Sequence, residues 1–188
     1  MALASIVEVH SRRLLIRPVA EDDLEDLQAI NGDPEVTRFL PYATWVSRDD
    51  ASAWLKRMAA LTASGTGRQL VVVTRDTGKV VGTLLLFRYE EGSARVELGY
   101  VLGRRYWRQG FMSEAITAIC EHAFGSMAMR RIEAEVNTAN TASDRLLRKV
   151  GFMLEGTRRQ RWVAKGVAYD TNLYGCLAED RARTTPDR

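Results

Sequence analysis

Histidine and cysteine are scarce in this chain, and their scarcity argues against several kinds of site. The 188 residues include two histidines and two cysteines. His10 and His122 lie far apart and have no carboxylates at metal-ligand spacing, which argues against a zinc site and against a histidine-based catalytic triad. Cys120 and Cys176 form no C-x-x-C pair, and each lies in an apolar pattern. We therefore expect two buried free thiols and no metal cofactor.

Long apolar runs and a strong charge of one sign are also absent. No stretch of 18 apolar residues occurs, and the opening MALASIVEVHSRR does not combine a basic region with an apolar core. We expect neither a transmembrane helix nor a signal peptide, and we expect a cytoplasmic location. The net charge is +3, from 27 basic and 24 acidic residues, without a lysine-rich stripe. This mild excess argues against direct nucleic-acid binding and suits a small anionic ligand.

Four common catalytic or nucleotide-binding motifs are missing. The sequence contains no G-x-x-x-x-G-K-[ST] phosphate loop, no G-x-G-x-x-G, no G-x-S-x-G nucleophile elbow and no H-E-x-x-H. Whatever chemistry the chain performs must therefore use few ionisable side chains.

The periodic segments that are present predict an α/β (α+β) fold. Apolar patterns predict strands over residues 13–19, 69–75, 80–90, 95–102, 131–136, 152–163 and 169–176. Helical spacing and capping signals predict helices over residues 21–31, 48–61, 110–124 and 141–151. The short turns DTGK and EGSA join three of the strands into an antiparallel meander. We expect one domain over 1–188, with a loose tail from about residue 180.

The stretch RRYWRQGFMSEA (Arg104–Ala115) joins a predicted strand to a predicted helix that starts near Gly110. Unpaired N–H groups at a helix N-terminus bind phosphate, and a glycine there lets a ligand approach the backbone closely. The arginines supply counter-charge. On these residues alone, a phosphate site and a solvated basic turn are equally good interpretations.

Two further pieces place this stretch in a pattern. ELGYVL precedes it, and NTANTASDRLLRKVGFMLEGTRRQ follows it. Together they resemble the GNAT superfamily of acyl-CoA N-acyltransferases, in particular the branch of ribosomal-protein serine/alanine N-terminal acetyltransferases. The segment RLLIRPVAEDDLEDLQAINGDPEVTRFLP resembles the same branch, so the resemblance covers nearly the whole chain. It implies a mixed, mostly antiparallel twisted sheet of about seven strands with about four helices, and acetyl-CoA as cosubstrate.

The resemblance also implies which residues contact coenzyme A. The backbone of Tyr100, Val101 and Leu102 would pair with the pantetheine arm. The pyrophosphate would be held by Arg108, Gln109, Gly110, Phe111, Met112 and Ser113. Asn137, Asn140 and Ser143 would lie along the arm near the thioester, although Asn140 and Ser143 are equally natural helix N-caps.

The sequence departs from the family's phosphate motif, Gln/Arg-x-x-Gly-x-Gly/Ala. The corresponding residues are Trp107, Gly110 and Met112, so the middle glycine alone is kept, and Arg108 stands where many relatives have a second glycine. Because the pyrophosphate is bound mainly by backbone amides, we expect the site to be preserved.

Glu97 is the candidate general base. Strand alternation places Glu97, Gly99 and Val101 on one face, and Val96, Leu98, Tyr100 and Leu102 on the other. Burial would raise the pKa of a carboxyl group in mid-strand toward that of a base. The alternative is a solvated, outward-facing Glu97. For the leaving thiolate, Ser143 and Tyr174 are candidate hydrogen-bond donors, but a thiolate needs little help.

The acceptor is expected in a cleft lined by residues 39–45, residues 87–89, Trp162 and Tyr169. A protein or peptide N-terminal α-amine is the favoured acceptor, because a useful fraction of such amines is neutral near pH 7. The alternatives are a small amine such as an antibiotic, amino acid or polyamine, and a non-catalytic acyl-CoA-binding module. The sequence leaves open whether the chain is a monomer or a homodimer.

Overall fold

The computed structural model describes Leu3 and residues 6–180, which fold around an eight-stranded sheet. Its strands are β1 (Val9–His10), β2 (Leu14–Pro18), β3 (Gly67–Thr74), β4 (Val80–Glu90), β5 (Arg95–Leu102), β6 (Arg131–Asn137), β7 (Met153–Ala164) and β8 (Val167–Leu177). Their order across the sheet is β1-β2-β3-β4-β5-β6-β8-β7. The expected mixed, mostly antiparallel sheet is confirmed. The strand added to the expected seven is β1, whose two residues are too few to leave a pattern in the sequence.

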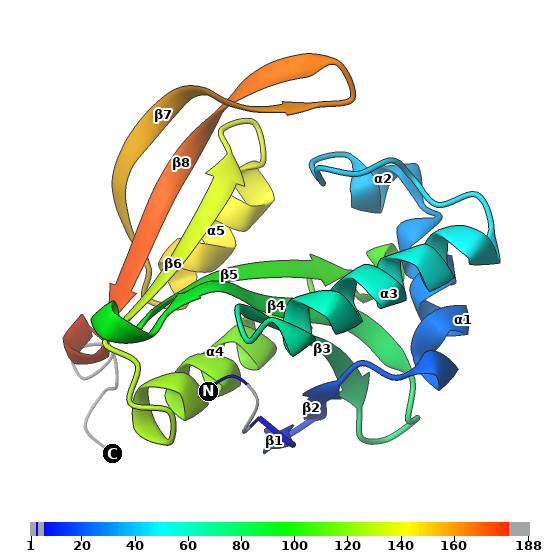
Figure 1. Cartoon of the computed structure of the whole chain (residues 1–188), viewed down its shortest axis with the longest axis horizontal. Helices are drawn as coiled ribbons and strands as arrows, with labels where there is room; N and C mark the ends of the chain where they lie inside the picture. The colour runs from blue at the N-terminus through cyan, green and yellow to red at the C-terminus, as the bar shows by residue number, and fades with distance from the viewer. Residues whose placement is uncertain (1–2, 4–5, 181–188) are drawn as a thin grey trace.

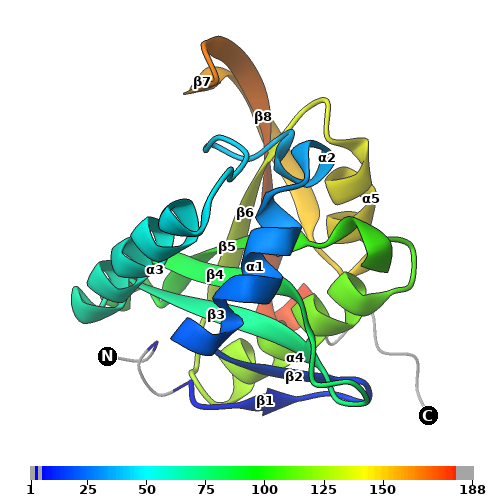
Figure 2. The ribbon, with the colours of Figure 1, turned by 90° about the vertical axis from the view of Figure 1, so that its right-hand side faces the viewer.

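Helices cover both faces of the sheet (Figures 1 and 2). They are α1 (Leu24–Asn31), α2 (Pro34–Thr37), α3 (Arg48–Ala63), α4 (Phe111–Gly125) and α5 (Thr141–Lys149). Buried residues of α1 and α3 pack on one face, and those of α4 and α5 pack on the other. The sequence does not predict the four-residue α2, which Asp33 caps by accepting the N–H of Glu35. Of the expected tail, residues 181–188 lie outside the described residues.

The central strands β3 and β4 are mostly apolar because both of their faces are covered. Nearly every residue of β3 and of the first half of β4 is buried. In β6 burial instead alternates, with Ile132, Ala134 and Val136 buried on the α4 side. The charged residues between them, Glu133 and Glu135, therefore lie on the same face of the sheet as Glu97 of β5.

The sheet divides between β5 and β6. These two strands are parallel because α4 connects them as a crossover, and they pair only from Arg95 opposite Arg131 to Glu97 opposite Glu133. Beyond Glu97, β5 remains paired with β4, and β6 remains paired with β8 as far as Asn137. The second half of β5 thus has a backbone edge that no strand of the described residues occupies.

The β7–β8 hairpin extends beyond the rest of the sheet, and its tip approaches α2 (Figure 1). Its two-residue turn, Lys165-Gly166, has φ of +52° and +77°, as a type I′ turn requires. Lys165 Nζ donates a hydrogen bond to the Thr37 carbonyl oxygen at 2.7 Å. The hairpin and α2 are therefore joined across the side of the molecule on which Glu97 lies.

Candidate functional site

A loop with two left-handed residues leads from β5 into α4. Gly110 is the N-cap of α4 and has φ of +80°, and Arg108 has φ of +61°. The predicted helix start is thus confirmed to within one residue. The first N–H groups of the helix, from Phe111 to Ser113, have no acceptor within it, so this end can bind an anion. Arg108 is exposed and has no hydrogen-bond or ion-pair partner among the described residues, so its cation is available at this loop.

The loop is held in place by the turn between β1 and β2 and by Glu114 of α4. Arg13 donates to the Gln109 carbonyl oxygen at 3.1 Å and to Glu114 Oε2 at 2.6 Å, and Ser11 Oγ donates to Glu114 Oε1 at 2.8 Å. Burial would raise the pKa of Glu114, but the hydrogen bonds from Arg13 and Ser11 outweigh it and lower that pKa. This support has no local signal in the sequence, because Arg13 and Glu114 are about 100 residues apart and meet only in the fold.

Trp107 and Phe111 have roles that the motif did not reveal. Trp107 Nε1 donates to the Leu102 carbonyl oxygen at 2.8 Å, which ties the loop to the end of β5. The ring of Phe111 lies against Tyr106 and under the Arg13 guanidinium, whose carbon is 4.4 Å from the ring centre. The Met112 side chain is buried in the core, so a ligand can reach this residue only through its backbone.

The beginning of α5 lies next to the free edge of β5. Asn140 caps α5 by accepting the N–H of Ser143 at 3.2 Å, and Asn137 at the end of β6 accepts the N–H of Ala139 at 2.9 Å. Ser143 itself is inside the helix and is not the N-cap. Burial raises the pKa of the Tyr100 hydroxyl, while the nearby Ser143 opposes that rise, so β5 and α5 are close neighbours here.

These features fit a long, anionic, amide-containing ligand such as coenzyme A. The free edge of β5 offers backbone groups to an extended arm, as a further strand would use them. The α4 N-terminus at the end of that edge offers N–H groups and a cation to phosphate. The buried Tyr100 hydroxyl has no hydrogen-bond partner in the described part of the chain, which leaves a polar atom for a ligand beside Ser143.

Tyr174 is less suited to the predicted role of proton donor. Its side chain is fully buried, and its hydroxyl donates to the Asp144 carboxylate. That bond is the main cause that lowers the pKa of Asp144. The hydroxyl is therefore already engaged with a carboxylate of α5.

Glu97 is buried, which excludes the outward, solvated alternative. Its side chain is 10% exposed, and Arg88 Nη1 donates to its Oε2 at 2.7 Å. The predicted faces of β5 are confirmed, since Val96 and Leu98 pack with α4 whereas Val101 packs with α1 and α3. Burial raises the pKa of Glu97, and Arg88 offsets that rise only in part.

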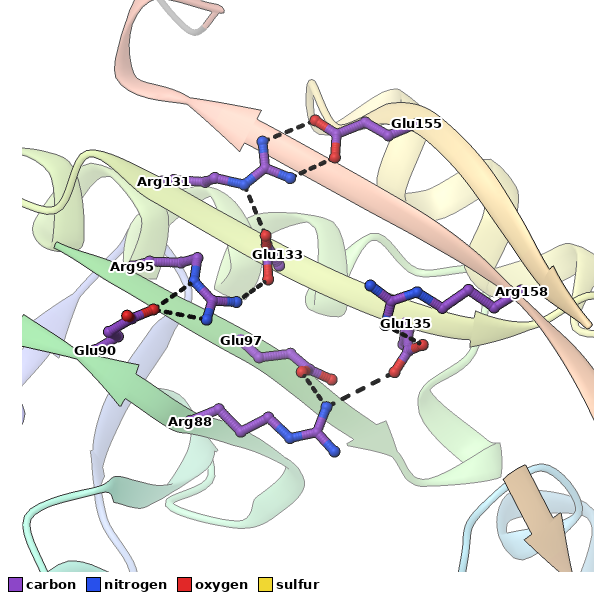
Figure 3. Close-up of polar contacts among 9 residues, drawn as sticks. All are labelled: Arg88, Glu90, Arg95, Glu97, Arg131, Glu133, Glu135, Glu155 and Arg158. Carbon is purple, nitrogen blue, oxygen red and sulfur yellow. Dashed lines mark hydrogen bonds and ion pairs between the residues drawn. The ribbon is translucent and has the colours of Figure 1, made fainter. Parts of the chain in front are cut away.

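Glu97 belongs to a cluster of charged side chains that the sequence does not predict. Arg88 reaches from β4 toward Glu97 of β5 and Glu135 of β6, which Figure 3 shows pointing toward one another. Glu135 also accepts from Arg158 Nη1 at 3.3 Å and Arg161 Nε at 3.1 Å. The alternation in RIEAEV could have placed Glu135 on the face of Glu97, but not its partners, which come from strands that pair irregularly.

A second ion network holds β5 and β6 together where they are paired. Arg95 bonds to Glu90 and Glu133, and Arg131 bonds to Glu133 and Glu155 (Figure 3). This network joins β4, β5, β6 and β7 at the closed end of the sheet. The ion pairs therefore hold β5 and β6 together at the end of the sheet from which the two strands separate.

The aromatic residues expected to line an acceptor cleft are divided between the core and the charged cluster. Trp45 is buried and packs against Trp54, and the Tyr42 hydroxyl donates to Asn31, so these two aromatics belong to the core under α1 and α3. Trp162 and Phe87 do flank the cluster, with ring centres 5.3 and 5.5 Å from the Arg88 guanidinium carbon.

Three other sequence predictions have structural outcomes. Cys120 and Cys176 are buried and free of disulfides, as expected. Within residues 6–180 and Leu3, no group of three or more His, Cys, Asp or Glu side chains is arranged to hold a metal ion. Over the same residues, no helix has the length and apolar character that crossing a membrane requires.

Comparison with known proteins agrees with this geometry. A family model described as an acetyltransferase (GNAT) domain matches residues 13–153. The uncharacterized N-acetyltransferase YoaA of Bacillus subtilis (strain 168) is 35% identical over 165 residues, 88% of this chain and 93% of the relative. The ribosomal-protein-serine acetyltransferase of Escherichia coli (strain K12) is 24% identical over 135 residues, 72% of this chain and 74% of the relative.

Two solved structures share the fold and contain coenzyme A. RimL, a ribosomal α-N-protein acetyltransferase, superposes with a TM-score of 0.82 at 20% identity and covers 92% of this chain and 99% of its own. A spermidine N-acetyltransferase from Vibrio cholerae, solved with coenzyme A and spermine, superposes with a TM-score of 0.79 at 16% identity and covers the same shares. The fold thus serves both a protein and a polyamine acceptor.

Proposed function

The chain belongs to the GNAT family of N-acetyltransferases, and from that premise we propose that it transfers the acetyl group of acetyl-CoA to a protein or peptide N-terminal α-amine. The observation that carries the proposal is the divided sheet. Its free β5 edge begins at the buried Glu97 and leads into the loop that ends at the N-terminus of α4.

In this proposal the cosubstrate is held along the division between β5 and β6. The backbone of Tyr100–Leu102 pairs with the pantetheine arm, and the N–H groups of residues 109–113, with Arg108, hold the pyrophosphate. Asn137, Asn140 and Ser143 line the other side of the arm. Acetyl-CoA supplies the acetyl group as a thioester: the amine nitrogen bonds to the carbonyl carbon, the carbon–sulfur bond breaks, and coenzyme A leaves as the thiol.

Glu97 takes the proton that the amine must lose, directly or through a water molecule. A carboxylate with a raised pKa is a better base than an ordinary one, and the burial of Glu97 supports this role. An α-amine has a pKa of about 7.7–8.0, whereas a lysine amine has one of about 10.4. One carboxylate is therefore sufficient to deprotonate an α-amine, which is why we favour the α-amine as the acceptor.

The charge near Glu97 disfavours a polyamine. Arg88, Arg158 and Arg161 surround Glu97 and Glu135, so three guanidinium groups face two carboxylates. A substrate with several cations would be repelled here. The similarity to a spermidine acetyltransferase is one of fold alone.

A thiol-release assay with acetyl-CoA tests the proposal. Each acceptor peptide is used with a free α-amine, with the α-amine blocked, and with lysine amines blocked. We expect release that requires the free α-amine and does not require lysine. Release with small amines alone would identify a small-molecule acetyltransferase. Coenzyme A binding without amine-dependent release would identify a non-catalytic acyl-CoA-binding module.

A further inference from the structure

Arg88 occupies a strained position where strand β4 is irregular. The pairing of β4 with β5 shifts register between Phe87 and Glu90, as at a β-bulge, and Arg88 has φ of +51°. A left-handed backbone costs an ordinary residue of order 1–3 kcal/mol, and such residues gather at functional sites. Here the bulge turns the Arg88 side chain over Glu97, which regular pairing would not do.

Arg88 is far more exposed than the two carboxylates that it faces. Its side chain is 41% exposed, whereas those of Glu97 and Glu135 are 10% and 5% exposed. Its Nη1 faces both carboxylates, at 2.7 Å from Glu97 and 3.7 Å from Glu135. Its Nη2 has no hydrogen-bond partner among the described residues. A ligand that approaches Glu97 therefore meets a guanidinium group with a free donor.

The surroundings make this donor suitable for an anion. Glu135 already accepts from Arg158, Arg161, Trp162 and Thr171, so it needs little from Arg88. Phe87 and Trp162 flank the guanidinium and limit its movement. A planar guanidinium with free N–H groups binds carboxylates by paired hydrogen bonds.

We propose that Arg88 binds a carboxylate that the acceptor carries a few bonds from its reacting amine. The inference rests on the proposed function, because it assigns the substrate class of the same site. Arg88 and Glu97 touch, so one acceptor that reaches both must have its amine and its carboxylate close together. Free α-amino acids and peptides that begin with aspartate or glutamate have this chemistry in common.

The same contact connects acceptor binding to the base. Arg88 stabilises the ionised form of Glu97 and so weakens it as a base. When the acceptor's carboxylate shares Arg88, that stabilisation decreases, and Glu97 more readily takes a proton from the acceptor's ammonium group. The other charged groups facing Glu97 are Glu133 and Glu135 of β6, and Arg158 and Arg161 of β7 reach Glu135. Arg88 alone among them contacts Glu97 directly.

Matched acceptors test this assignment. The first pair is a peptide that begins with Asp and one that begins with Asn, which tests a side-chain carboxylate. The second pair is a free amino acid and its amide, which tests an α-carboxylate. We expect the wild-type kcat/KM to be about 10- to 100-fold higher for at least one acidic member over its neutral partner, from one charged hydrogen bond. Equal kcat/KM values within both pairs would overturn the proposal without any variant.

Variants of Arg88 test whether this residue causes the preference for acidic acceptors. Arg88→Gln should remove the preference, and Arg88→Lys should keep part of it. Arg159→Gln is the matched control: Arg159 is exposed on β7 and has no hydrogen bond or ion pair among the described residues. An equal loss of preference in Arg159→Gln would indicate diffuse attraction and would exclude a specific site at Arg88.

Two readouts keep this inference separate from the proposed function. Calorimetry of the Asp and Asn peptides with the enzyme and coenzyme A measures binding without turnover, and Arg88→Gln should reduce only the Asp peptide's affinity. In pH–rate profiles, Arg88→Gln should move the acidic limb to higher pH, because Glu97 loses the cation that lowers its pKa. Transfer to α-amines with no acidic preference would refute the inference alone, whereas no transfer to any amine would refute the proposed function.

Discussion

At the scale of single residues, Gly110 is the position on which the coenzyme A site depends most. It combines a φ of +80° with a place at the N-cap of α4, where a ligand must come close to the backbone. A side chain there would strain the turn, and its Cβ would lie 3.4 Å from the Arg13 guanidinium.

Gly110→Val should therefore weaken coenzyme A binding about tenfold or more, because a left-handed turn costs an L-residue about 1–2 kcal/mol. Isothermal titration calorimetry with coenzyme A measures the loss. Gly78→Val is the matched control, since Gly78 has φ of +68° and lies in the turn before β4. If both variants bind coenzyme A equally well, the phosphate site has been assigned to the wrong residues.

Glu97→Gln separates catalysis from stability. We expect kcat to fall most at acidic pH, where little neutral amine is available without a base. The folded-state pKa of Glu97 is raised, mainly by burial, so ionising it costs the folded state free energy. That cost is absent below the unfolded pKa of about 4.3 and grows as pH rises toward the folded value.

The variant should accordingly gain stability relative to wild type as pH rises through this window, although it also loses the charged contact with Arg88. Urea unfolding at a series of pH values measures the difference. An unchanged pH–rate profile would remove Glu97 as the base, and a stability difference that is independent of pH would contradict its raised pKa.

At the scale of elements, the start of α4 is held by the turn between β1 and β2, through the contact of Arg13 with Glu114. The sequence predicted the helix, its first turn and the neighbouring strand, because capping and periodicity are local signals. It could not predict the support from the β1–β2 turn, nor the cluster of Arg88, Glu97 and Glu135, because these contacts join residues that are distant in the chain. The bulge at Arg88 has no sequence signal, since arginine is unusual in a left-handed turn.

Glu114→Gln should destabilise the protein by about 1.5–3 kcal/mol, the range for hydrogen bonds to charged groups. Glu114 has a lowered folded-state pKa, so its contribution is present above the unfolded pKa and is lost as pH falls through the folded value. We also expect a several-fold weaker affinity for coenzyme A, because the loop loses its preorganisation. A double-mutant cycle with Arg13→Gln measures the coupling. Additive effects of the two changes would show that the pair does not support the loop.

At the scale of the whole molecule, the β7–β8 hairpin and α2 meet across the side that holds Glu97. The sequence predicted both strands and the turn between them, but the hydrogen bond from Lys165 to Thr37 depends on how far the hairpin extends past the sheet. The sequence did not show which aromatic residues lie near Glu97. Trp45, for example, is buried in the core, and an aromatic residue in the core has the same sequence pattern as one that lines a cleft.

Lys165→Met should raise the KM for the acceptor about 3- to 10-fold, the equivalent of one hydrogen bond, and should leave the affinity for coenzyme A unchanged. Lys56→Met, on an exposed position of α3, is the control for loss of a lysine. Steady-state kinetics in both substrates measures the effect. An altered coenzyme A affinity together with an unchanged acceptor KM would show that the hairpin contact does not contribute to acceptor binding.

The most direct test of the whole account is mass spectrometry of peptide acceptors incubated with the enzyme and acetyl-CoA. We expect one added acetyl group, located by fragmentation on the N-terminal α-amine. Acetylation found only on lysine side chains or only on small amines, or coenzyme A binding without any acetylated product, would contradict it.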